Sequence, residues 1–364
     1  MSIIIFIIIL LILVVVHEAG HFFTAKSFGI RVDEFGFGFP PKLFGIKKGE
    51  TEYTINALPF GGFVKIYGES SIEENNSNSD LSRSLIRKPK WQQSLVMFAG
   101  IFANFILAGI LFSIVFFMGS PLATDSIPSN IKNKMTEQLI VLSVNDNTPA
   151  SRSGIKNKDI IYSVETKNEK IIKPTLAEFI NFSNKPGENI HISIIRNGEE
   201  NFVDVVPEEN ISLGRAFVGI SPGVLLSGKF NFFESFKYGF QTAVFSAKDT
   251  FVAFGKLFKG GEESKQLRDS VIGPVGLVKV TGIVSEFGIG YLLSFMAVIS
   301  ISLAVINLLP FPALDGGRLL FLLIEKIKGS RINPKIADNV NMVGFFLLII
   351  LMLLVTYHDI VKLL

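Results

Sequence analysis

Four long stretches without a charged side chain constrain the fold of this sequence more than any other feature. A helix needs about 20 apolar residues to cross the roughly 30 Å of hydrocarbon in a bilayer. Three stretches reach that length alone, and the run Ile3–Val16 reaches it because further apolar residues follow it as far as Ala25. We therefore predict a polytopic α-helical membrane protein with about four transmembrane helices. The stretches comprise residues 3–16, 94–118, 287–314 and 339–357.

The composition agrees with a membrane protein and excludes several other classes. Charged residues make up 18% of the chain, whereas soluble domains have about 25%. The net charge of +3 is weak, and no basic run is interleaved with aromatic residues, so a nucleic-acid partner is not expected. Cysteine is absent, which excludes disulfides and thiolate zinc sites. Any metal must therefore be held by histidine and carboxylate side chains.

The first apolar stretch has an alternative interpretation, because 14 apolar residues also match the core of a signal peptide. A signal peptide normally has a Lys or Arg before its core and a small-x-small cleavage site after it. Neither feature is present around Ile3–Val16. A transmembrane helix is therefore the preferred interpretation.

The connections between the four helices predict the topology. Residues 27–90 and 315–338 both contain clustered Lys and Arg, and the positive-inside tendency places such segments on the cytoplasmic side. The long connection between the second and third helices then lies outside. The predicted parts are transmembrane helix 1 (1–26), a cytoplasmic-side membrane-associated β-hairpin region and basic loop (27–90), helix 2 (91–118), a folded periplasmic domain (119–230), an amphipathic helix and linker (231–286), helix 3 (287–314), a cytoplasmic connection (315–338) and helix 4 (339–364).

The first helix contains a candidate metal site in the segment His17-Glu18-Ala19-Gly20-His21. Residues four apart lie on one face of a helix, so the two histidines can hold one metal ion. Glu18 can reach a water on that metal as a general base, and zinc lowers the pKa of such a water. Ionisable residues inside a membrane span are costly, which favours a functional role over simple packing of a His-Glu pair.

A catalytic zinc needs a third protein ligand, for which three residues are candidates. His191 belongs to an alternating run typical of an exposed strand position, and His358 is expected at the membrane interface at the end of the fourth helix. Asp315 is the first charge after 28 uncharged residues. From the spacing alone, a metal ligand and a helix cap both stay open for Asp315.

Two motifs, HExxH in the first helix and Asn307-x-x-Pro310-x-Pro312-x-Leu-Asp315-Gly in the third, give the sequence a family resemblance. The chain resembles the site-2 protease family of intramembrane zinc metalloproteases, in particular the bacterial regulator-of-sigma-E protease type. The resemblance implies that His17, His21 and Asp315 bind Zn²⁺, that Glu18 is the catalytic base, and that Asn307 takes part in substrate handling. Phe35–Pro40, Leu58–Lys65 and Ile272–Gly276 extend it over nearly the whole chain.

Substrate binding is expected beside this site, because a helical substrate must be held extended to expose its peptide bonds. Pro310 and Pro312 break the third helix and free backbone groups. Gly36 and Gly38 are expected in a re-entrant hairpin whose edge pairs with the unwound substrate, although an ordinary turn explains these glycines equally well.

The second helix departs from the family pattern where Gly100-Ile101 replaces the usual Gly-Pro. The change affects the expected shape of the helix and not the chemistry. For Asn104, four residues after Gly100, a role near the site and a simple interhelical hydrogen bond both stay open.

The external segment is expected to be one inserted PDZ-like α+β domain, with alternating strands around one helix in residues 137–206. Pro149–Ile160 resembles the signature of a PDZ domain but lacks the usual Gly before Asp159. The family resemblance implies that such a domain gates substrates by size. Phenylalanines 232, 233, 236 and 240 then recur at helical spacing. They predict an amphipathic helix that lies on the membrane or under the PDZ-like domain.

Three functions follow as hypotheses. The first is an intramembrane zinc metalloendopeptidase of the bacterial inner membrane, with its active site toward the cytoplasm and the PDZ-like domain outside. Its expected partners are transmembrane segments of single-pass proteins such as an anti-sigma factor or remnant signal peptides, an upstream site-1-type protease, and membrane lipid. The second is a membrane-anchored zinc protease that acts on soluble peptides. The third is a non-catalytic PDZ membrane scaffold.

Overall fold

The computed structural model describes residues 1–69, 81–123, 127–196, 198–210, 215–257, 259–262, 264–265, 267 and 271–363. The chain divides into two compact units. One unit combines Met1–Ile114 with Phe232–Leu364, and the other is Val115–Asn231.

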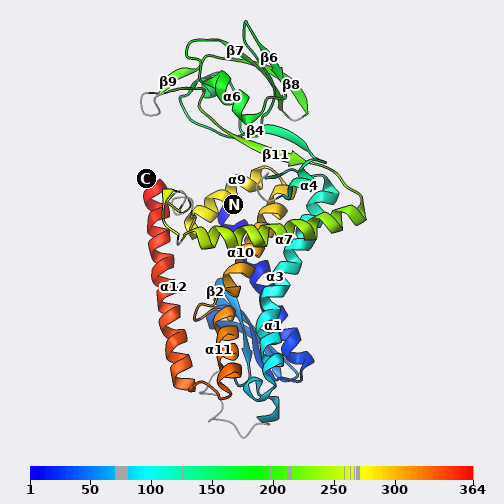
Figure 1. The fold of residues 1–364 in the computed structure, drawn as a ribbon, viewed down its shortest axis with the longest axis vertical. Coiled ribbons are helices and arrows are strands. Elements are labelled where there is room, and N and C mark those ends of the chain that lie inside the picture. Colours follow the sequence, from blue (N-terminus) through cyan, green and yellow to red (C-terminus); the bar gives the residue numbers. More distant parts are fainter. Residues whose placement is uncertain are drawn as a thin grey trace. The chain divides into compact units, whose positions relative to one another are not determined.

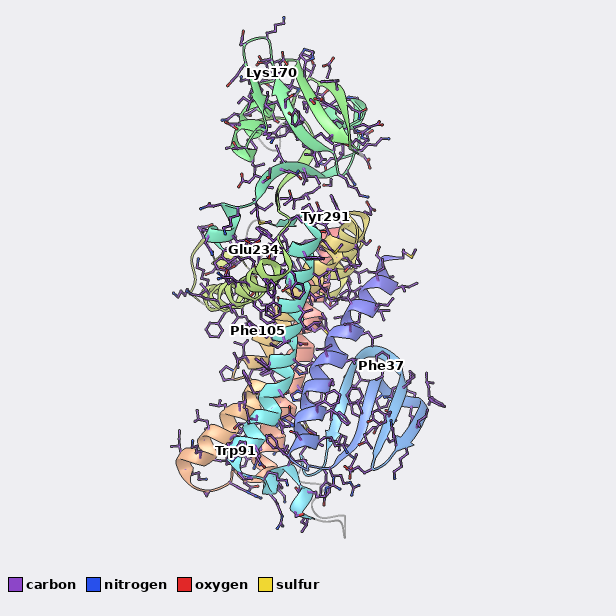
Figure 2. The ribbon with its side chains drawn as sticks, turned by 90° about the vertical axis from the view of Figure 1, so that its right-hand side faces the viewer. Phe37, Trp91, Phe105, Lys170, Glu234 and Tyr291 are labelled. Atoms are coloured by element: carbon purple, nitrogen blue, oxygen red, sulfur yellow. The ribbon has the colours of Figure 1, made fainter. Side chains whose placement is uncertain are left out.

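The four apolar stretches each form a helix that is long and apolar enough to cross a membrane. They are α1 (Ser2–Ser27), α3 (Lys90–Met118), α10 (Ile289–Leu308) and α12 (Pro334–Leu363) (Figure 1). Trp91 and Tyr291 lie at opposite ends of the first unit in Figure 2. Trp and Tyr are enriched at both edges of a bilayer, so these two residues agree with a membrane-spanning bundle.

The third helix is shorter than the uncharged stretch 287–314 in which it lies. It ends at Leu308, and Leu309 is extended with ψ 140°. The next residue is Pro310, whose ring disfavours the helical conformation in the residue before it. Residues 309–314 therefore form a non-helical connection, which leads into α11 (Asp315–Lys328). The predicted cytoplasmic connection 315–338 is thus largely helical.

A small sheet packs on α1 and is made by β1 (Val32–Lys48) and β2 (Thr51–Ile66). Residues Glu34–Phe37 have β partners on both sides: residues 62–65 on one and residues 52–55 on the other. The last part of β2 consequently forms one edge of this sheet. Val32, Val64 and Ile66 are buried against Phe22 and Ala25 of α1. This contact fixes the edge beside the histidines of α1.

Two further helices belong to the first unit, α7 (Phe232–Leu257) and α9 (Pro274–Glu286). The linker predicted within 231–286 is thus partly helical. The N-terminus of α9 is tied to α12, because the carboxylate of Asp359 accepts hydrogen bonds from the N–H groups of Gly273 (3.0 Å) and Gly276 (2.8 Å). Asp359 is buried. The last turns of α12 are therefore fixed by a specific polar contact.

The amphipathic helix α7 runs crosswise to α10 in Figure 1, and its faces are inverted relative to a helix of a soluble protein. The buried face carries small or polar residues such as Ser235, Gly239 and Thr242. Phe232 and Phe233 point outward and are 66% and 83% exposed. An outward aromatic face is typical of a helix at a membrane surface.

The second unit is an α+β fold around one sheet in the order β3-β11-β4-β5-β7-β8, with β6 paired to β5. Phe179 and Phe182 of α6 pack on the sheet in its core. A capping box begins α6, because Thr175 and Glu178 each satisfy the other's backbone N–H. The elements are β3 (Leu122–Ala123), α4 (Ser129–Lys132), β4 (Thr136–Val144), α5 (Pro149–Arg152), β5 (Ile160–Glu165), β6 (Lys170–Ile172), α6 (Leu176–Ser183), β7 (Ile190–Arg196), β8 (Glu199–Val205), β9 (Glu208–Asn210), β10 (Arg215–Phe217) and β11 (Ile220–Ser227).

Candidate metal centre

Three side chains from the two ends of the chain converge on one point inside the first unit. His17 and His21 lie one turn apart on α1, and their Nε2 atoms are 3.2 Å apart. Oδ2 of Asp315, the first residue of α11, lies 3.1 Å from Nε2 of His17 and 3.3 Å from Nε2 of His21. Among the residues that the structure describes, these three form the one group suited to hold a metal ion.

The spacing of these atoms fits zinc. Two ligand atoms at about 2.05 Å from a tetrahedral zinc ion lie about 3.3 Å apart. The observed separations of 3.1–3.3 Å agree with this value. Oδ2 of Asp315 is also buried and has no hydrogen-bond partner. A buried carboxylate oxygen without a donor is costly unless a cation satisfies it.

The ring of His21 is oriented by the second membrane helix. Its Nδ1 lies 2.7 Å from the carbonyl oxygen of Val96 in α3. A carbonyl oxygen only accepts, so Nδ1 carries the proton and Nε2 keeps its lone pair toward the metal point. A backbone carbonyl that fixes a histidine in this way is a common outer partner of metal ligands.

The side chain of Asn104 plays the corresponding part for His17. Its amide nitrogen lies 3.4 Å from Nδ1 of His17, Asn104 is buried, and its Oδ1 has no hydrogen-bond partner. The amide oxygen and nitrogen exchange places by a half-turn of the side chain. With the oxygen toward the ring, it accepts the Nδ1 proton and leaves Nε2 free for a metal. From the sequence alone the role of Asn104 stays open. The available signal is its position four residues after Gly100 in the family pattern of the second helix.

Glycines allow α1 and α3 to approach closely enough for these contacts. A Cβ atom on Gly20 would lie 2.4 Å from the carbonyl oxygen of Ala99. A Cβ atom on Gly100 would lie 2.3 Å from Nε2 of His21. Both distances are too short for any side chain. Gly20 and Gly100 therefore belong to the site because they must lack a side chain, although neither can supply a metal ligand.

The connection between α10 and α11 presents Asp315 to the histidines. A Cβ atom on Gly316 would lie 2.2 Å from the oxygen of Leu309, and one on Gly317 would lie 2.2 Å from the oxygen of Phe311. Ala313 has a φ of 71°, a left-handed conformation that is strained for a residue with a side chain. Its N–H donates to Oδ1 of Asn341 at 3.3 Å. Gly316, Gly317 and the strained turn at Ala313 together bring the carboxylate of Asp315 to the two histidines.

Glu18 lies next to the three converging side chains and faces the sheet edge. Its side chain lines the same cavity as Phe63 and Val64 of that edge. A Cβ atom on Gly62 would come within 3.8 Å of Cγ of Glu18. The edge formed by Gly62–Ile66 therefore borders this residue directly.

A cavity of about 310 Å³ contains the site, and we call it the metal-site cavity. His17, Glu18, His21 and Asp315 all line it. The structure brings these four side chains together, whereas their roles stay predictions. The other lining residues are Phe63, Val64, Ile66, Glu69, Met97, Ala313, Leu314 and Arg318.

The predicted substrate-binding residues lie outside the described lining of this cavity. Gly36 sits behind the edge, where a Cβ atom on it would lie 2.4 Å from the ring of Phe63, and Gly38 is beside the oxygen of Leu58. Pro310 is exposed, Asn307 is half-buried, and Pro312 packs on Gly344. Their role in substrate binding stays a prediction. The segment Phe63–Ile66, which overlaps the Leu58–Lys65 motif but is not assigned to the site from the sequence, borders the site instead.

The two other histidines are placed as the sequence suggests. His191 is exposed on β7 and pairs with Asp204. His358 is exposed near the end of α12. Neither belongs to the described metal group.

Comparison with known proteins gives matches along almost the full chain. The sequence model of peptidase family M50 matches residues 5–351. A Clostridium perfringens protein named as a predicted zinc metalloprotease is 40% identical over 95% of each chain. A similarly named protein of Clostridium acetobutylicum is 34% identical over 99% of this chain and 97% of its own. The zinc metalloprotease RasP of Geobacillus kaustophilus is 30% identical over 99% of this chain and 98% of its own.

Proposed function

The chain belongs to peptidase family M50 and is a zinc metalloprotease of the membrane, and from this premise we propose that it hydrolyses peptide bonds inside transmembrane segments. The observation that carries the proposal is the position of the site. His17, Glu18 and His21 lie within α1, directly after 14 apolar residues. A substrate must enter the membrane to reach them.

In the proposed site, His17, His21 and Asp315 would hold Zn²⁺. When bound, the ion would supply Lewis-acid polarisation of the scissile carbonyl and a lower pKa for the attacking water. The carbonyl of Val96 and the amide of Asn104 keep the two imidazoles in the tautomer that ligates through Nε2. These outer contacts set the site before a substrate arrives.

Glu18 is the proposed general base. It takes a proton from the attacking water and returns it to the amine of the leaving peptide, so that the carboxylate is regenerated. Glu18 is half-buried and lines the metal-site cavity, where partial shielding from water strengthens its interactions with charge that develops in the site.

The edge Gly62–Ile66 is the proposed binding surface for an unwound substrate. Its outer side faces Glu18, and its inner side pairs with Glu34–Phe37. An extended chain that pairs with this edge would expose its peptide bonds to the site. The expected re-entrant character of the hairpin, with Gly36 and Gly38 behind the edge, is part of this proposal.

The remaining expectations belong to the same proposal. The protein lies in a bacterial inner membrane with its active site toward the cytoplasm. The Val115–Asn231 unit is a PDZ-like domain outside, which limits entry to substrates that an upstream site-1-type protease has shortened. The substrates are single-pass segments of an anti-sigma factor or remnant signal peptides. The α+β fold of this unit and its Pro149–Ile160 segment support a PDZ relationship.

The test is cleavage of a model transmembrane substrate in detergent by the wild-type protein and by Glu18→Gln, with Glu137→Gln as a control on the surface of the second unit. We expect the Glu18 variant to lose at least about 100-fold in kcat, as expected for removal of a general base. The control should keep wild-type activity. Equal activity of the wild type and the Glu18 variant would refute the assignment.

A second arm separates the proposal from its alternatives. The residues around the cut are supplied as a soluble peptide. Cleavage of this peptide as efficiently as the membrane substrate would indicate a membrane-anchored protease of ordinary substrates. No cleavage of either substrate by zinc-loaded protein would favour a scaffold.

A further inference from the structure

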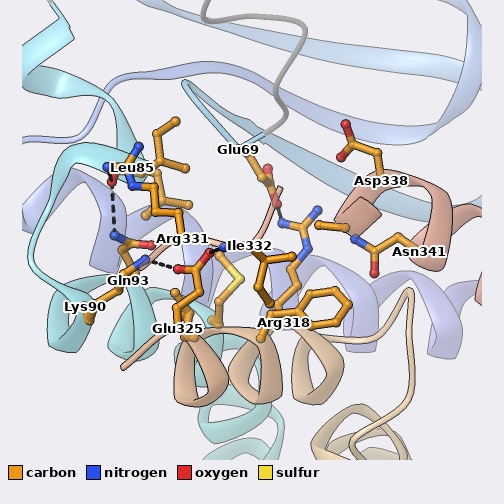
Figure 3. Close-up of a pocket in the computed structure, with 15 residues that line it drawn as sticks. Glu69, Leu85, Lys90, Gln93, Arg318, Glu325, Arg331, Ile332, Asp338 and Asn341 are labelled. Carbon is orange, nitrogen blue, oxygen red and sulfur yellow. Dashed lines mark hydrogen bonds and ion pairs between the residues drawn. The ribbon is translucent and has the colours of Figure 1, made fainter. Parts of the chain in front are cut away.

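A second cavity lies beside the metal-site cavity, between the start of α3, the length of α11 and the start of α12 (Figure 3). We call it the flanking cavity, and its volume is about 210 Å³. Glu69, Met97 and Arg318 line both cavities. The two spaces therefore meet at these three residues.

The helix that supplies a predicted metal ligand also forms a wall of the flanking cavity. Asp315 begins α11, and Arg318, Leu322 and Glu325 follow at intervals of three, four and three residues, which places them along one face. The distance along the axis from Asp315 to Glu325 is about 15 Å. One helix face thus leads from the metal point to the far end of the flanking cavity.

The facing wall comes from α3 and has the same regularity. Lys90, Gln93 and Met97 are spaced by three and four residues and all line the flanking cavity. Met97 directly follows Val96, whose carbonyl orients His21. Both walls therefore start at the metal ligands and run away from them together.

The charges of the flanking cavity are balanced and largely paired within it. Three acidic and three basic side chains line it. Lys90 pairs with Glu325, and Arg318 pairs with Glu69. Arg331 donates to the carbonyl oxygen of Ile86. Each of these three cations already has an acceptor, so a phosphate would have to displace an existing contact.

The remaining lining suits a polypeptide. Leu85, Met97, Phe321 and Leu322 supply apolar surface, and the amide groups of Gln93 and Asn341 supply polar contacts. Recognition sites with an apolar lining and a few placed polar groups suit neutral, amphipathic ligands. The roughly 15 Å from the metal point accepts four to five residues of extended chain at about 3.3 Å per residue. The part along the flanking cavity, from Arg318 to Glu325, is about 10 Å and accepts about three of them.

We infer that the flanking cavity binds the outer three of the four to five substrate residues that follow the scissile bond toward the cytoplasmic end of the cleaved segment. This inference rests on the proposed function. The Arg318–Glu69 pair sits where the chain passes from one cavity to the other.

The test fills the flanking cavity and varies the substrate. Ala337 lines it and is half-buried in the first turns of α12, whereas its neighbour Ile336 is 56% exposed and lies outside the cavity. Ala337→Trp is compared with Ile336→Trp as the matched control. Each variant receives a transmembrane substrate with a full cytoplasmic flank and one whose flank ends two residues from the cut.

We expect Ala337→Trp to raise the KM for the full-flank substrate about 10-fold, which corresponds to the loss of one modest contact surface. The KM for the short-flank substrate should not change. Ile336→Trp should match the wild type on both substrates. Equal effects of Ala337→Trp on both substrates, or none on either, would overturn the inference. If the wild type cuts neither substrate, the proposed function itself has failed.

A crosslinking experiment gives a readout that does not depend on turnover. A photoreactive residue is placed four residues from the cut on the cytoplasmic side of the substrate, and the Glu18→Gln protein serves as a trap. We expect adducts on peptides that contain Leu322 or Ala337. Adducts confined to other parts of the chain would contradict binding in the flanking cavity.

Discussion

The helices around His17 and the outer helix α12 differ in how closely they pack. At the metal centre, Gly20 and Gly100 allow contacts that exclude even a methyl group. Along α12, by contrast, most apolar side chains are exposed, as for Phe345 at 54% and Leu354 at 61%. Contacts at Gly344 beside Pro312, at Asn341 and at Asp359 fix α12. Close packing is thus found where the three side chains converge, while a surface that faces lipid requires only apolar side chains.

The first and largest expected effect is on the metal centre itself. Asp315→Ala leaves two protein ligands, fewer than a catalytic zinc site has. Zinc content should fall to a small fraction of the wild-type value. Cleavage should fall by more than about 100-fold, because loss of a residue that only orients a metal ligand already costs up to about 100-fold. Metal analysis of purified protein measures the first change, with His191→Ala as the control. Unchanged zinc content would remove Asp315 from the ligand set.

The close contact between α1 and α3 gives the second prediction. Gly100→Ala places a Cβ atom 2.3 Å from Nε2 of His21, so the ring or the helix must move. We expect zinc affinity to fall about 10- to 100-fold, comparable with loss of a hydrogen-bond partner that orients a metal ligand. Gly255→Ala on α7 meets no atom within 4 Å and serves as the control. Competition with a chelator measures the zinc affinity of both variants. Equal affinities would show that α3 shifts to accept the added methyl group without disturbing His21.

The partner of His17 gives a smaller effect at the same site. Asn104→Leu removes the acceptor for the Nδ1 proton, whereas Asn104→Asp keeps an oxygen there. Zinc affinity should fall about 10-fold in the leucine variant and stay near the wild-type value in the aspartate variant. Chelator titration distinguishes the two. A loss of equal size in both variants would indicate that Asn104 acts through packing alone.

The polar contact of α12 should affect stability more than catalysis. Asp359→Ala leaves the N–H groups of Gly273 and Gly276 without their acceptor. The expected loss is about 1–3 kcal/mol in the free energy of unfolding, the cost of an unsatisfied buried group. Thermal unfolding in detergent measures this loss. Asp359→Asn keeps one oxygen, so its stability should lie between those of the wild type and Asp359→Ala. A large loss of zinc in the alanine variant would show that α12 and the metal centre are coupled.

The smallest effect concerns the turn of the β1–β2 hairpin. Arg83 and then Lys26 hold the pKa of Glu50 at about 2, below its usual 4.5. Because the pKa is lowered in the folded protein, the stabilisation is complete above about pH 4.5 and is lost as the pH falls toward 2. Glu50→Gln should therefore be less stable than the wild type at pH 7, and the difference should disappear near pH 2. Denaturation across that range measures it, and a constant difference would contradict this origin.

The sequence predicts the parts of the site that depend on local spacing. His17 and His21 are one helical turn apart, so their convergence follows from the chain alone. Asp315 needs the family resemblance, because nothing in its surroundings distinguishes a ligand from a cap. The edge Gly62–Ile66 is not predictable in this way. Its place depends on pairing with Glu34–Phe37, which are about 30 residues away in the chain.

The fold shows a related limit in α7 and at the end of α10. The phenylalanines of α7 repeat at helical spacing, which predicts the helix but not which face is buried. Contact with lipid leaves the aromatic face outward, and small residues such as Gly239 make the protein contact. Pro310 ends the third helix earlier than its uncharged stretch suggests, because Leu309 must be extended.

The separation of the ligands along the chain affects when the enzyme becomes active during its own synthesis. Asp315 is made 294 residues after His21. At about 5–20 residues per second, this interval lasts roughly 15 to 60 s. During that time the growing chain carries the two histidines and Glu18 without the aspartate. In the proposed site, the third metal ligand is thus missing until the α10–α11 segment has been synthesised and packed against α1.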